Sequence, residues 1–557
     1  MKLTKTQKKF VKKNIRKKSL RDISKNLNIP LEDLGIHIKE TWGKEKFNDL
    51  ESPRDILRPQ SIKYNKKLVF VFLAFWVFVC YLNSLGNDFV SDDIPIISAN
   101  PQINNISYIF GPLIFNIRNT VIFLTNKLFG LDPMYFRLPN ILLHLGVSYL
   151  LFILAAELVS ETVGLITAIV FAVHPLAVEA VAWISGGPYV FTAFLILLML
   201  YFYLKNKKLL SLLMFFASVN ILIHSAPLGL LPFAFETSQG ALKKNWKRTV
   251  PYIVIIASII PISITLAKQR AESLHLEHYQ EKTLMSPLLQ IPTAVGEYLK
   301  LMFFPKDLTL YHTEISFSPV SFSLHFFVFM CVVLLLFFLY KKSRPLIFWP
   351  LLFLIALSAT LTPFGISWIV AERYSYFASA GIFVLVAWTM EKTIKKLSKE
   401  NYPKALYLSL AIIIIPLSIR TIVRNRDWRS HDTLWIATAK FSPSSPQNHN
   451  NLGDYYGRHK QYEKAIEEFK KAIELKPGYA DAYHNLANVY GETGDIENAI
   501  ENYQNAIKYN QNLWQSYQNL GAIYFNSGDK EKAKKYLKKA LELNPENKNL
   551  KGIVDTL

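Results

Sequence analysis

The chain has 557 residues, of which 51% are hydrophobic, and a formal net charge of +21. Its apolar residues concentrate between about residues 67 and 425, in long runs separated by Lys/Arg clusters. This distribution indicates a membrane protein and excludes an ordinary soluble enzyme. The two cysteines, Cys80 and Cys331, both lie in apolar runs, which excludes a disulfide framework and a thiolate metal site.

The N-terminal tail, residues 1–66, is strongly basic. Residues 1–67 contain 19 Lys and Arg against 8 Asp and Glu, a net charge of +11. Apolar residues at near-helical spacing predict short amphipathic helices between residues 4 and 45, with a break at Pro30. They are Phe10, Ile15, Leu20, Ile23, Leu27, Ile29, Leu34 and Ile38. Two interpretations remain open: a small helix-turn-helix-like module that binds nucleic acid, or a basic appendage on a cytoplasmic membrane surface. The second is favoured because no recognition helix stands out.

About eleven apolar runs are candidate membrane spans. They are residues 67–86, 134–158, 162–183, 188–204, 208–224, 226–241, 249–267, 321–340, 345–364, 368–390 and 404–423. No cleavable signal is expected, since the first run lies deep in the chain and no small-residue cleavage site follows it.

The positive-inside rule gives these spans an orientation. With the N-terminus in the cytoplasm, four loops on that side carry Lys/Arg clusters, namely Lys205, Lys207 and Lys208; Lys243, Lys244, Lys247 and Arg248; Lys341, Lys342 and Arg344; and Lys392, Lys395 and Lys396. The run 285–304 then lies at the interface or re-enters without crossing. Eleven crossings place the C-terminus outside the cytoplasm.

A repeat of 34 residues follows a linker at residues 426–447. Five columns recur at this period: Ala465, Ala499 and Ala533; Ala472, Ala506 and Ala540; Leu452, Leu486 and Leu520; Tyr456, Tyr490 and Tyr524; and Phe469, Tyr503 and Leu537. This period predicts three tetratricopeptide (TPR) repeats over residues 448–557, with Pro477 and Pro545 ending two of the second helices. The fold class is therefore all-α: a polytopic helix bundle followed by a TPR α-solenoid.

Adjacent acids, Asp92 and Asp93, lie within about ten residues of the first span, on its predicted outer side. A carboxylate in a partly desolvated cleft can act as a general base that deprotonates an acceptor hydroxyl. The alternative is a helix cap or turn, for which Asp is also suited.

Three polar clusters interrupt apolar helices, where ionisable groups are costly and indicate function. They are Asn140 and His144; His174, Pro175 and Glu179; and Glu372, Arg373, Tyr374 and Tyr376. We expect Arg373, held by Glu372, to bind a lipid-linked phosphate, because a guanidinium group matches phosphate oxygens. The other interpretation is interhelical hydrogen bonding that fixes the bundle.

At the level of motifs, the chain resembles the transmembrane and tetratricopeptide-repeat-containing proteins, O-mannosyltransferases of the GT-C superfamily. The resemblance covers about residues 67–557 and rests on "NDFVSDD", "GLDPMYFRLPNILLH", "HPLAVEAVAWISG", "AERYSYFAS", "RNRDWRSHDTLW" and the repeats. It implies a GT-C-type bundle over residues 67–425, with Asp92 and Asp93 as the catalytic pair. It also implies a polyprenyl phosphate-linked sugar as donor and repeats on the luminal or periplasmic side. The composition suggests a bacterial inner-membrane member.

The chain departs from the family pattern at three places. Gly187, Pro188 and Tyr189 stand where Arg and an acid are usual, Arg137 stands where His is common, and Asn119 follows Arg118 where Pro is usual. These departures leave the donor sugar open, and a degenerate enzyme is the alternative. No cofactor is expected, because no dedicated metal-ligand cluster is present; family precedents differ on a divalent metal.

Asn451, Asn485 and Asn519 share one column of the first repeat helices. Their amides can form a ladder that holds an extended acceptor peptide, resembling the asparagine ladder of other repeat-bearing glycosyltransferases. The alternative is that they satisfy local backbone. The leading hypothesis is sugar transfer to a hydroxyl of an exported protein, with His144, His174 and Glu179 joining Arg373 and Glu372 around the donor phosphate. A non-catalytic TPR scaffold in the cell envelope is the second hypothesis, and a lipid or sugar carrier the third.

Overall fold

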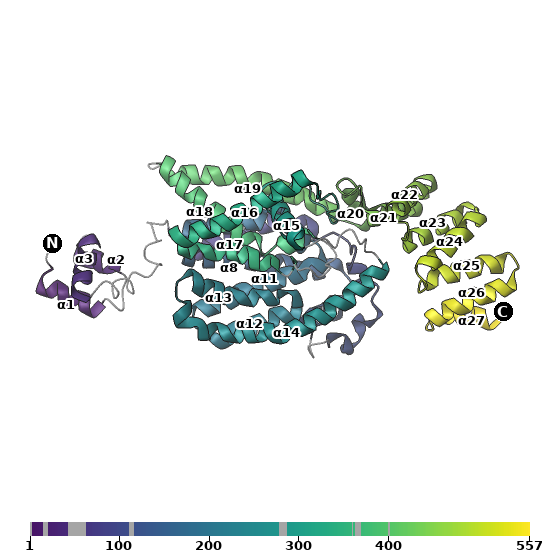
Figure 1. The fold of residues 1–557 in the computed structure, drawn as a ribbon, viewed down its shortest axis with the longest axis horizontal. Helices are drawn as coiled ribbons and strands as arrows, with labels where there is room; N and C mark the ends of the chain where they lie inside the picture. The colour runs from purple at the N-terminus through teal and green to yellow at the C-terminus, as the bar shows by residue number, and fades with distance from the viewer. Residues whose placement is uncertain are drawn as a thin grey trace.

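The computed structural model describes residues 3–14, 20–29, 31–42, 63–110, 116–277, 287–358, 360–361, 369–398 and 401–556. Within these ranges the regular elements are all helices, which confirms the all-α prediction. Three helical parts follow one another along the long axis of the molecule (Figure 1). A small N-terminal group comes first, then a large bundle, and then the repeats at the C-terminal end.

The N-terminal group consists of α1 (Lys5–Asn14), α2 (Leu20–Leu27) and α3 (Leu31–Trp42). The helices flank the predicted break at position 30. Val11, Ile23, Leu34 and Ile38 are buried together between them, with Phe10 packed alongside. Ile15 lies outside the described residues. The amphipathic spacing therefore builds a small core of its own.

Six helices in the described chain are long and apolar enough to cross a membrane, or seven if one bent pair counts as a span. The six are α6 (Lys66–Tyr81, continued to Ser84), α8 (Pro133–Leu158), α11 (Gly187–Leu204, preceded by a turn from Ile184), the first part of α14 (Leu242–Glu277), α16 (Pro319–Lys342) and α19 (Tyr402–Asp427).

The predicted count of about eleven spans is not confirmed. The run 208–224 forms α12 (Lys208–Ile221) and the run 345–364 contains α17 (Phe348–Ser358), both shorter than a span. The run 226–241 divides into a 3-10 segment and the eight-residue α13 (Leu231–Ser238). In the described part of the run 368–390, a 3-10 turn (Glu372–Ser375) comes first, and α18 (Ser379–Leu397) starts only afterwards, with lysines in its last turn.

The run 162–183 is the bent pair. It divides into α9 (Glu161–Val173) and a second segment, Pro175–Val181, which ends in the short α10 (Val178–Val181), at an angle of 56°. Pro175 has no backbone N–H to continue the helix, and the His174 side chain caps the new turn by accepting from the Leu176 N–H at 3.2 Å. Hydropathy alone does not register such a break.

The remaining described helices complete the bundle and its linker. They are α7 (Ile117–Phe129), α15 (Pro287–Phe303), which corresponds to the run expected not to cross, and α20 (His431–Ala439). α16 leaves most of its apolar side chains uncovered, including Val320, Leu324, Phe327 and Leu334. An uncovered apolar face of this extent on a long helix is what a lipid environment covers.

Basic loops gather at one end of the bundle. In the loop between α11 and α12, Lys205 pairs at 3.1 Å with Glu157, near the turn between α8 and α9. The N–H of Tyr64, just before the first span, donates to Glu161 beside that turn at 2.6 Å. Near the end of α18, Glu391 accepts from a serine hydroxyl in the turn at 3.0 Å. Segments at two of the four predicted cytoplasmic loops and the start of the first span thus all contact the region of the turn between α8 and α9.

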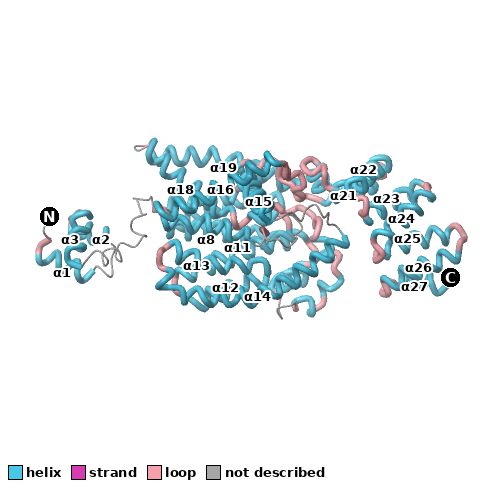
Figure 2. Tube along the Cα trace, in the orientation of Figure 1, coloured by secondary structure: helices cyan, strands magenta, loops and turns pink. Residues whose placement is uncertain are grey.

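The opposite end of the bundle carries the acidic loop and the linker to the repeats. The Asp88 N–H donates to the Arg429 carbonyl at 2.9 Å, and the hydroxyls of Thr309 and Ser442 are 2.9 Å apart. Much of the irregular chain lies at this end, between the bundle and the repeats (Figure 2). Because α6 runs from one end to the other, the acidic loop lies on the side of the repeats and away from the basic loops.

The C-terminal region forms three helix pairs and a final helix, as the 34-residue period predicts. They are α21 (Pro446–Arg458) and α22 (Tyr462–Leu475), α23 (Ala480–Thr493) and α24 (Ile496–Tyr509), α25 (Trp514–Asn526) and α26 (Lys530–Leu543), and α27 (Lys548–Thr556). The repeated alanines are fully buried, which lets each pair approach closely. α22 and α26 both end two residues before the predicted stop prolines.

Candidate active site

The two acids after the first span have different surroundings. Asp93 is fully buried and accepts from the N–H and hydroxyl of Ser185, at 2.8 and 2.6 Å, and from the Val90 N–H at 3.2 Å. Burial raises the pKa of Asp93 to about 6, against the opposing effect of these hydrogen bonds and of the Arg137 charge. Asp92 is exposed. Asp93 therefore holds the loop in place, while Asp92 remains accessible to a reactant.

Arg137 anchors the acidic loop from the second span. Its buried guanidinium donates to the carbonyls of Asn87, Asp88 and Ala182 at 2.7, 2.9 and 2.6 Å. The loop and the segment that follows the bent pair are thereby fixed to the start of α8. Sequence reasoning noticed Arg137 only as a departure from the family pattern; its role depends on partners 45 to 50 residues away in the chain.

The predicted pairing of Arg373 with Glu372 is wrong. The Arg373 guanidinium pairs with Glu179, whose carboxylate also accepts from the Arg373 N–H at 2.9 Å. The guanidinium lies 5.5 Å from the ring of Trp183. Glu372 instead pairs with Arg424 at 3.1 Å. Neighbouring residues of a helical turn do not face each other, so adjacency in the sequence does not make these two residues partners.

Arg424 is the centre of a buried ion cluster that sequence reasoning missed. Besides Glu372, it pairs with Asp427 at 2.8 Å, and His312 lies 3.7 Å from the same Glu372 oxygen. Arg424 and Glu372 are almost completely buried. The cluster ties α19 to the turn that carries Arg373. The signal for it was present in the "RNRDW" motif, where ionisable residues end an apolar helix.

The two predicted histidines lie inside the bundle. The ring nitrogens of His144 are 2.7 Å from the Tyr376 hydroxyl and 3.0 Å from the Ala172 carbonyl. His174 Nε2 is 3.0 Å from the Met302 carbonyl. Both rings are buried and hydrogen-bonded to other helices. The described contacts do not bring either ring to Asp92, and the interhelical interpretation fits them.

Tyr311, in the segment between α15 and α16, contacts the linker and the first repeat. Its ring stacks on Trp435 with centroids 5.8 Å apart, and its hydroxyl is hydrogen-bonded to Asn451. Burial, followed by the nearby charge of Asp92, raises the pKa of Tyr311. The first asparagine of the predicted ladder is therefore hydrogen-bonded to a residue on which the charge of Asp92 acts.

The other two ladder residues contact the preceding repeat. The Asn485 amide donates to Asn450 at 3.0 Å, and the Asn519 amide donates to Asn488 at 3.0 Å. All three predicted ladder residues are partly buried. The described bond of Asn485 uses one of the two N–H donors of its amide, which leaves the other for a peptide. The Asn519 amide also donates to the Tyr503 hydroxyl at 3.2 Å, so only its carbonyl oxygen remains for a peptide.

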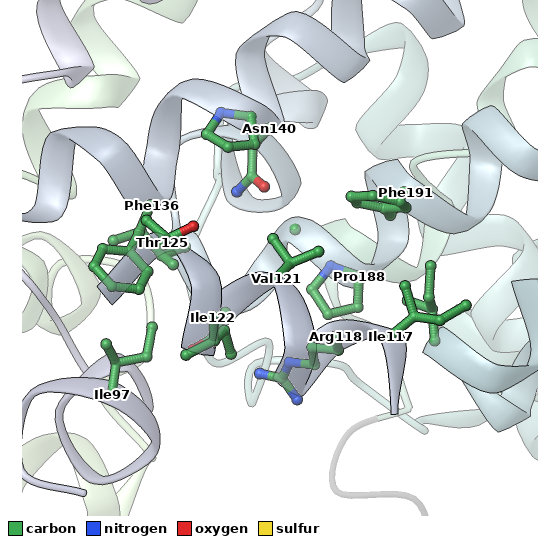
Figure 3. A pocket seen from close by; sticks show the side chains of 15 residues that line it. Ile97, Ile117, Arg118, Val121, Ile122, Thr125, Phe136, Asn140, Pro188 and Phe191 are labelled. Carbon is green, nitrogen blue, oxygen red and sulfur yellow. The ribbon is translucent and has the colours of Figure 1, made fainter. Parts of the chain in front are cut away.

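A pocket adjoins the acidic loop between α7, α8 and α11, and encloses about 560 Å³ of empty space, including the part open to the surroundings (Figure 3). Asn140 and Arg118 lie on opposite sides of it in this view. A Cβ atom at Gly187 would lie 2.3 Å from the Asn140 Oδ1, so a larger residue here would displace the Asn140 amide. Ser185, which holds Asp93, also lines the pocket. In the part of the chain that the structure describes, no group of three acids, histidines or cysteines could hold a metal.

The fold and this site define a helical membrane protein that carries a TPR array beside an acidic loop. A family model described as "TPR repeat" matches residues 458–494 and 488–528. A second model, described as "Tetratricopeptide repeat", matches residues 515–547. Human TMTC1, a protein O-mannosyl-transferase, is 24% identical over 496 residues, covering 72% of this chain and 54% of its own length. F38B6.6 of Caenorhabditis elegans, named likewise, is 23% identical and covers 77% and 65%.

Human TMTC3, a further protein O-mannosyl-transferase, is 31% identical over 114 residues, which are 20% of this chain and 12% of TMTC3. The chain is thus a homologue of the transmembrane and tetratricopeptide-repeat-containing proteins, as its motifs predict. It spans less than two thirds of the length of each of these relatives. Among solved structures, MamA matches 29% of this chain and 88% of its own at 26% identity, with a TM-score of 0.20.

Proposed function

We propose that this protein is a membrane glycosyltransferase that transfers a monosaccharide from a polyprenyl phosphate to a hydroxyl group of an exported protein. The observation that carries the proposal is the exposed Asp92 at the end of the bundle where the repeats begin. The charge of Asp92 raises the pKa of both Arg118 and Tyr311, against or together with the effect of burial. The names of the relatives support protein as the acceptor class and mannose as the sugar.

The proposed chemistry is a direct displacement at the anomeric carbon. The acceptor oxygen forms the new bond to that carbon as the bond to the phosphate oxygen breaks, and the polyprenyl phosphate leaves with the electron pair. Asp92 accepts the hydroxyl proton. Asp93 positions Asp92 by fixing the loop through Ser185 and Val90.

The acceptor reaches this site along the repeats. Asn451 is hydrogen-bonded to Tyr311, and the charge of Asp92 raises the pKa of the Tyr311 hydroxyl. A peptide held along the asparagine column would therefore arrive beside the acidic loop. Asn485 and Asn519 would continue the contact along the next two repeats. The array thus presents the acceptor to the same end of the bundle as the base.

The proposed orientation places the basic loops and residues 1–66 in the cytoplasm and the repeats outside it, in the periplasm of a bacterial inner membrane. The clustering of basic loops at the end opposite to the repeats supports this orientation. A lipid-borne sugar and an exported protein can meet only on the outer side.

Purified full-length protein tests the proposed function directly. We expect it to transfer radiolabelled mannose from undecaprenyl phosphate-mannose to threonine-containing peptides, and not from GDP-mannose. Release of label by β-elimination would identify the hydroxyl linkage. Absence of transfer with a range of peptides and with other undecaprenyl phosphate sugars would contradict the proposal and favour the scaffold hypothesis.

The buried Asp93 predicts how transfer depends on pH. Below about pH 6 Asp93 takes up a proton, so its carboxylate no longer accepts all three hydrogen bonds and activity falls. The Ser185 hydroxyl favours the charged form. Its loss in Ser185→Ala should therefore raise the pKa and move the acid limb of the pH profile upward by about one unit.

The matched control is Ser148→Ala, a buried serine of α8 whose hydroxyl bonds the His144 carbonyl at 2.8 Å. Its pH profile should equal that of the wild type. An unchanged acid limb in Ser185→Ala would show that Asp93 does not govern the profile.

A further inference from the structure

The cations around the acidic loop differ in whether their charge is already balanced. Arg373 is paired with Glu179, and Arg424 with Glu372. Each of these guanidinium groups therefore has its counter-ion inside the bundle. A phosphate that approached either of them would have to compete with a buried carboxylate, which is costly to leave alone.

Arg137 has no described carboxylate partner, but its guanidinium donates to three backbone carbonyls. Arg118 differs from all three of these arginines. None of the described residues gives its side chain a hydrogen bond or an ion pair within contact distance. Burial lowers the pKa of Arg118, while Tyr108 and then the charges of Asp92 and Asp93 oppose this effect. The Arg118 side chain is partly buried, and a guanidinium in this position without a direct partner is unfavourable, so an anion bound against it would be stabilising.

The surroundings of Arg118 are apolar. Of the fifteen described residues that line the pocket, Arg118 is the only one with a charge, and most of the others are aliphatic or aromatic (Figure 3). Val121, Ile122 and Phe191 are among them. The pocket is narrow and open on one side, so an extended chain can lie along its walls while part of it stays outside. Its chemistry is that of a ligand with one anionic head and an apolar chain.

The pocket is also within reach of a lipid. On the same helix, α7, the side chains of Leu124, Leu128 and Phe129 are half to three-quarters exposed. A short helix with an uncovered apolar edge and a basic residue, here Lys127, suits the interface of a membrane. An isoprenoid chain could thus pass from the membrane along α7 while its phosphate stays beside the acidic loop.

We propose that this pocket binds the polyprenyl phosphate carrier, with Arg118 holding the phosphate and the apolar walls holding the first isoprene units. The assignment deepens the proposed function, on which it rests for the identity of the lipid. It moves the phosphate ligand from Arg373, the residue that the sequence suggested, to Arg118. Arg373 then acts as a positioning residue through Glu179.

Binding of undecaprenyl phosphate to the full-length protein in detergent, followed by native mass spectrometry, tests this proposal without any sugar or acceptor. Undecaprenol serves as a probe of the isoprenoid chain alone, and inorganic phosphate as a probe of the phosphate head group alone. Arg118→Gln should weaken undecaprenyl phosphate binding about tenfold or more and leave undecaprenol unchanged. Val121→Phe, which fills the pocket, should weaken both lipids.

Two variants control for charge and for helix integrity. Lys127→Gln removes an exposed charge from the same helix and should bind as the wild type does, and Arg118→Lys should keep part of the affinity. Equal binding by Arg118→Gln and the wild type would overturn the proposal. If Arg118→Gln does not fold, equal binding of both lipids by Val121→Phe and the wild type would overturn it instead.

The outcome is separable from that of the proposed function. Arg118-dependent binding without any sugar transfer would leave the lipid site standing and remove the transferase. Transfer by the wild type together with full lipid binding by the Arg118 and Val121 variants would support the transferase and remove the proposed lipid site. Tight binding of inorganic phosphate alone would identify a free anion, and not a lipid, as the ligand.

Discussion

Asp92→Asn is expected to reduce sugar transfer by about 10² to 10⁴, the usual contribution of a general base. The asparagine has nearly the same shape but cannot accept the hydroxyl proton. Because the Asp92 side chain is exposed, its replacement should not change the thermal unfolding midpoint. The measurement is initial transfer rate from undecaprenyl phosphate-mannose, beside a melting curve of the same preparation.

The same loop offers two comparisons for this variant. Asp88 is exposed, and only its backbone makes the contacts that hold the loop, so Asp88→Asn should retain full activity. Asp93→Asn should lose both activity and stability. Its amide NH₂ group would face N–H or O–H donors of Val90 or Ser185, from which the carboxylate now accepts hydrogen bonds. Full activity in Asp92→Asn would place the base elsewhere or indicate a scaffold.

The parts of the fold that the sequence predicts well are those governed by local pattern. A strict 34-residue period specifies the TPR helices, because each repeat packs only on its neighbours. Uninterrupted runs such as 321–340 become single long helices. Runs that contain a break do not: His174 and Pro175 divide one predicted span, because a missing backbone donor outweighs continuous hydropathy.

The site was predictable by residue type but not by pairing. The motifs pointed to Asp92, Asp93, Glu179 and Arg373, and the structure brings Glu179 to Arg373 although they are 194 residues apart. Which acid of the pair is buried depends on Ser185, 92 residues further along. Such contacts are set by the packing of helices that are far apart in the sequence. A single sequence does not show which of these helices lie side by side in space.

Arg424→Met should destabilise the membrane domain by about 3 to 5 kcal/mol, the usual cost of leaving one partner of a buried ion pair uncompensated. Glu372 is fully buried and would lose the guanidinium that now lies at 3.1 Å, while His312 is further away at 3.7 Å. Thermal unfolding of the full-length protein in detergent, followed by near-ultraviolet circular dichroism, should show a markedly lower midpoint. The turn that carries Arg373 should loosen with it.

The reciprocal change separates an ion-pair effect from a loss of packing. The double variant Arg424→Met with Glu372→Gln removes both charges and should recover most of the lost stability, since a buried pair contributes little compared with uncharged groups of similar volume. Arg426→Met, at an exposed position of the same helix α19, should leave the midpoint unchanged. If the double variant is no more stable than Arg424→Met, the packing of the arginine stem would matter more than its charge, and the cluster would owe its stability to shape.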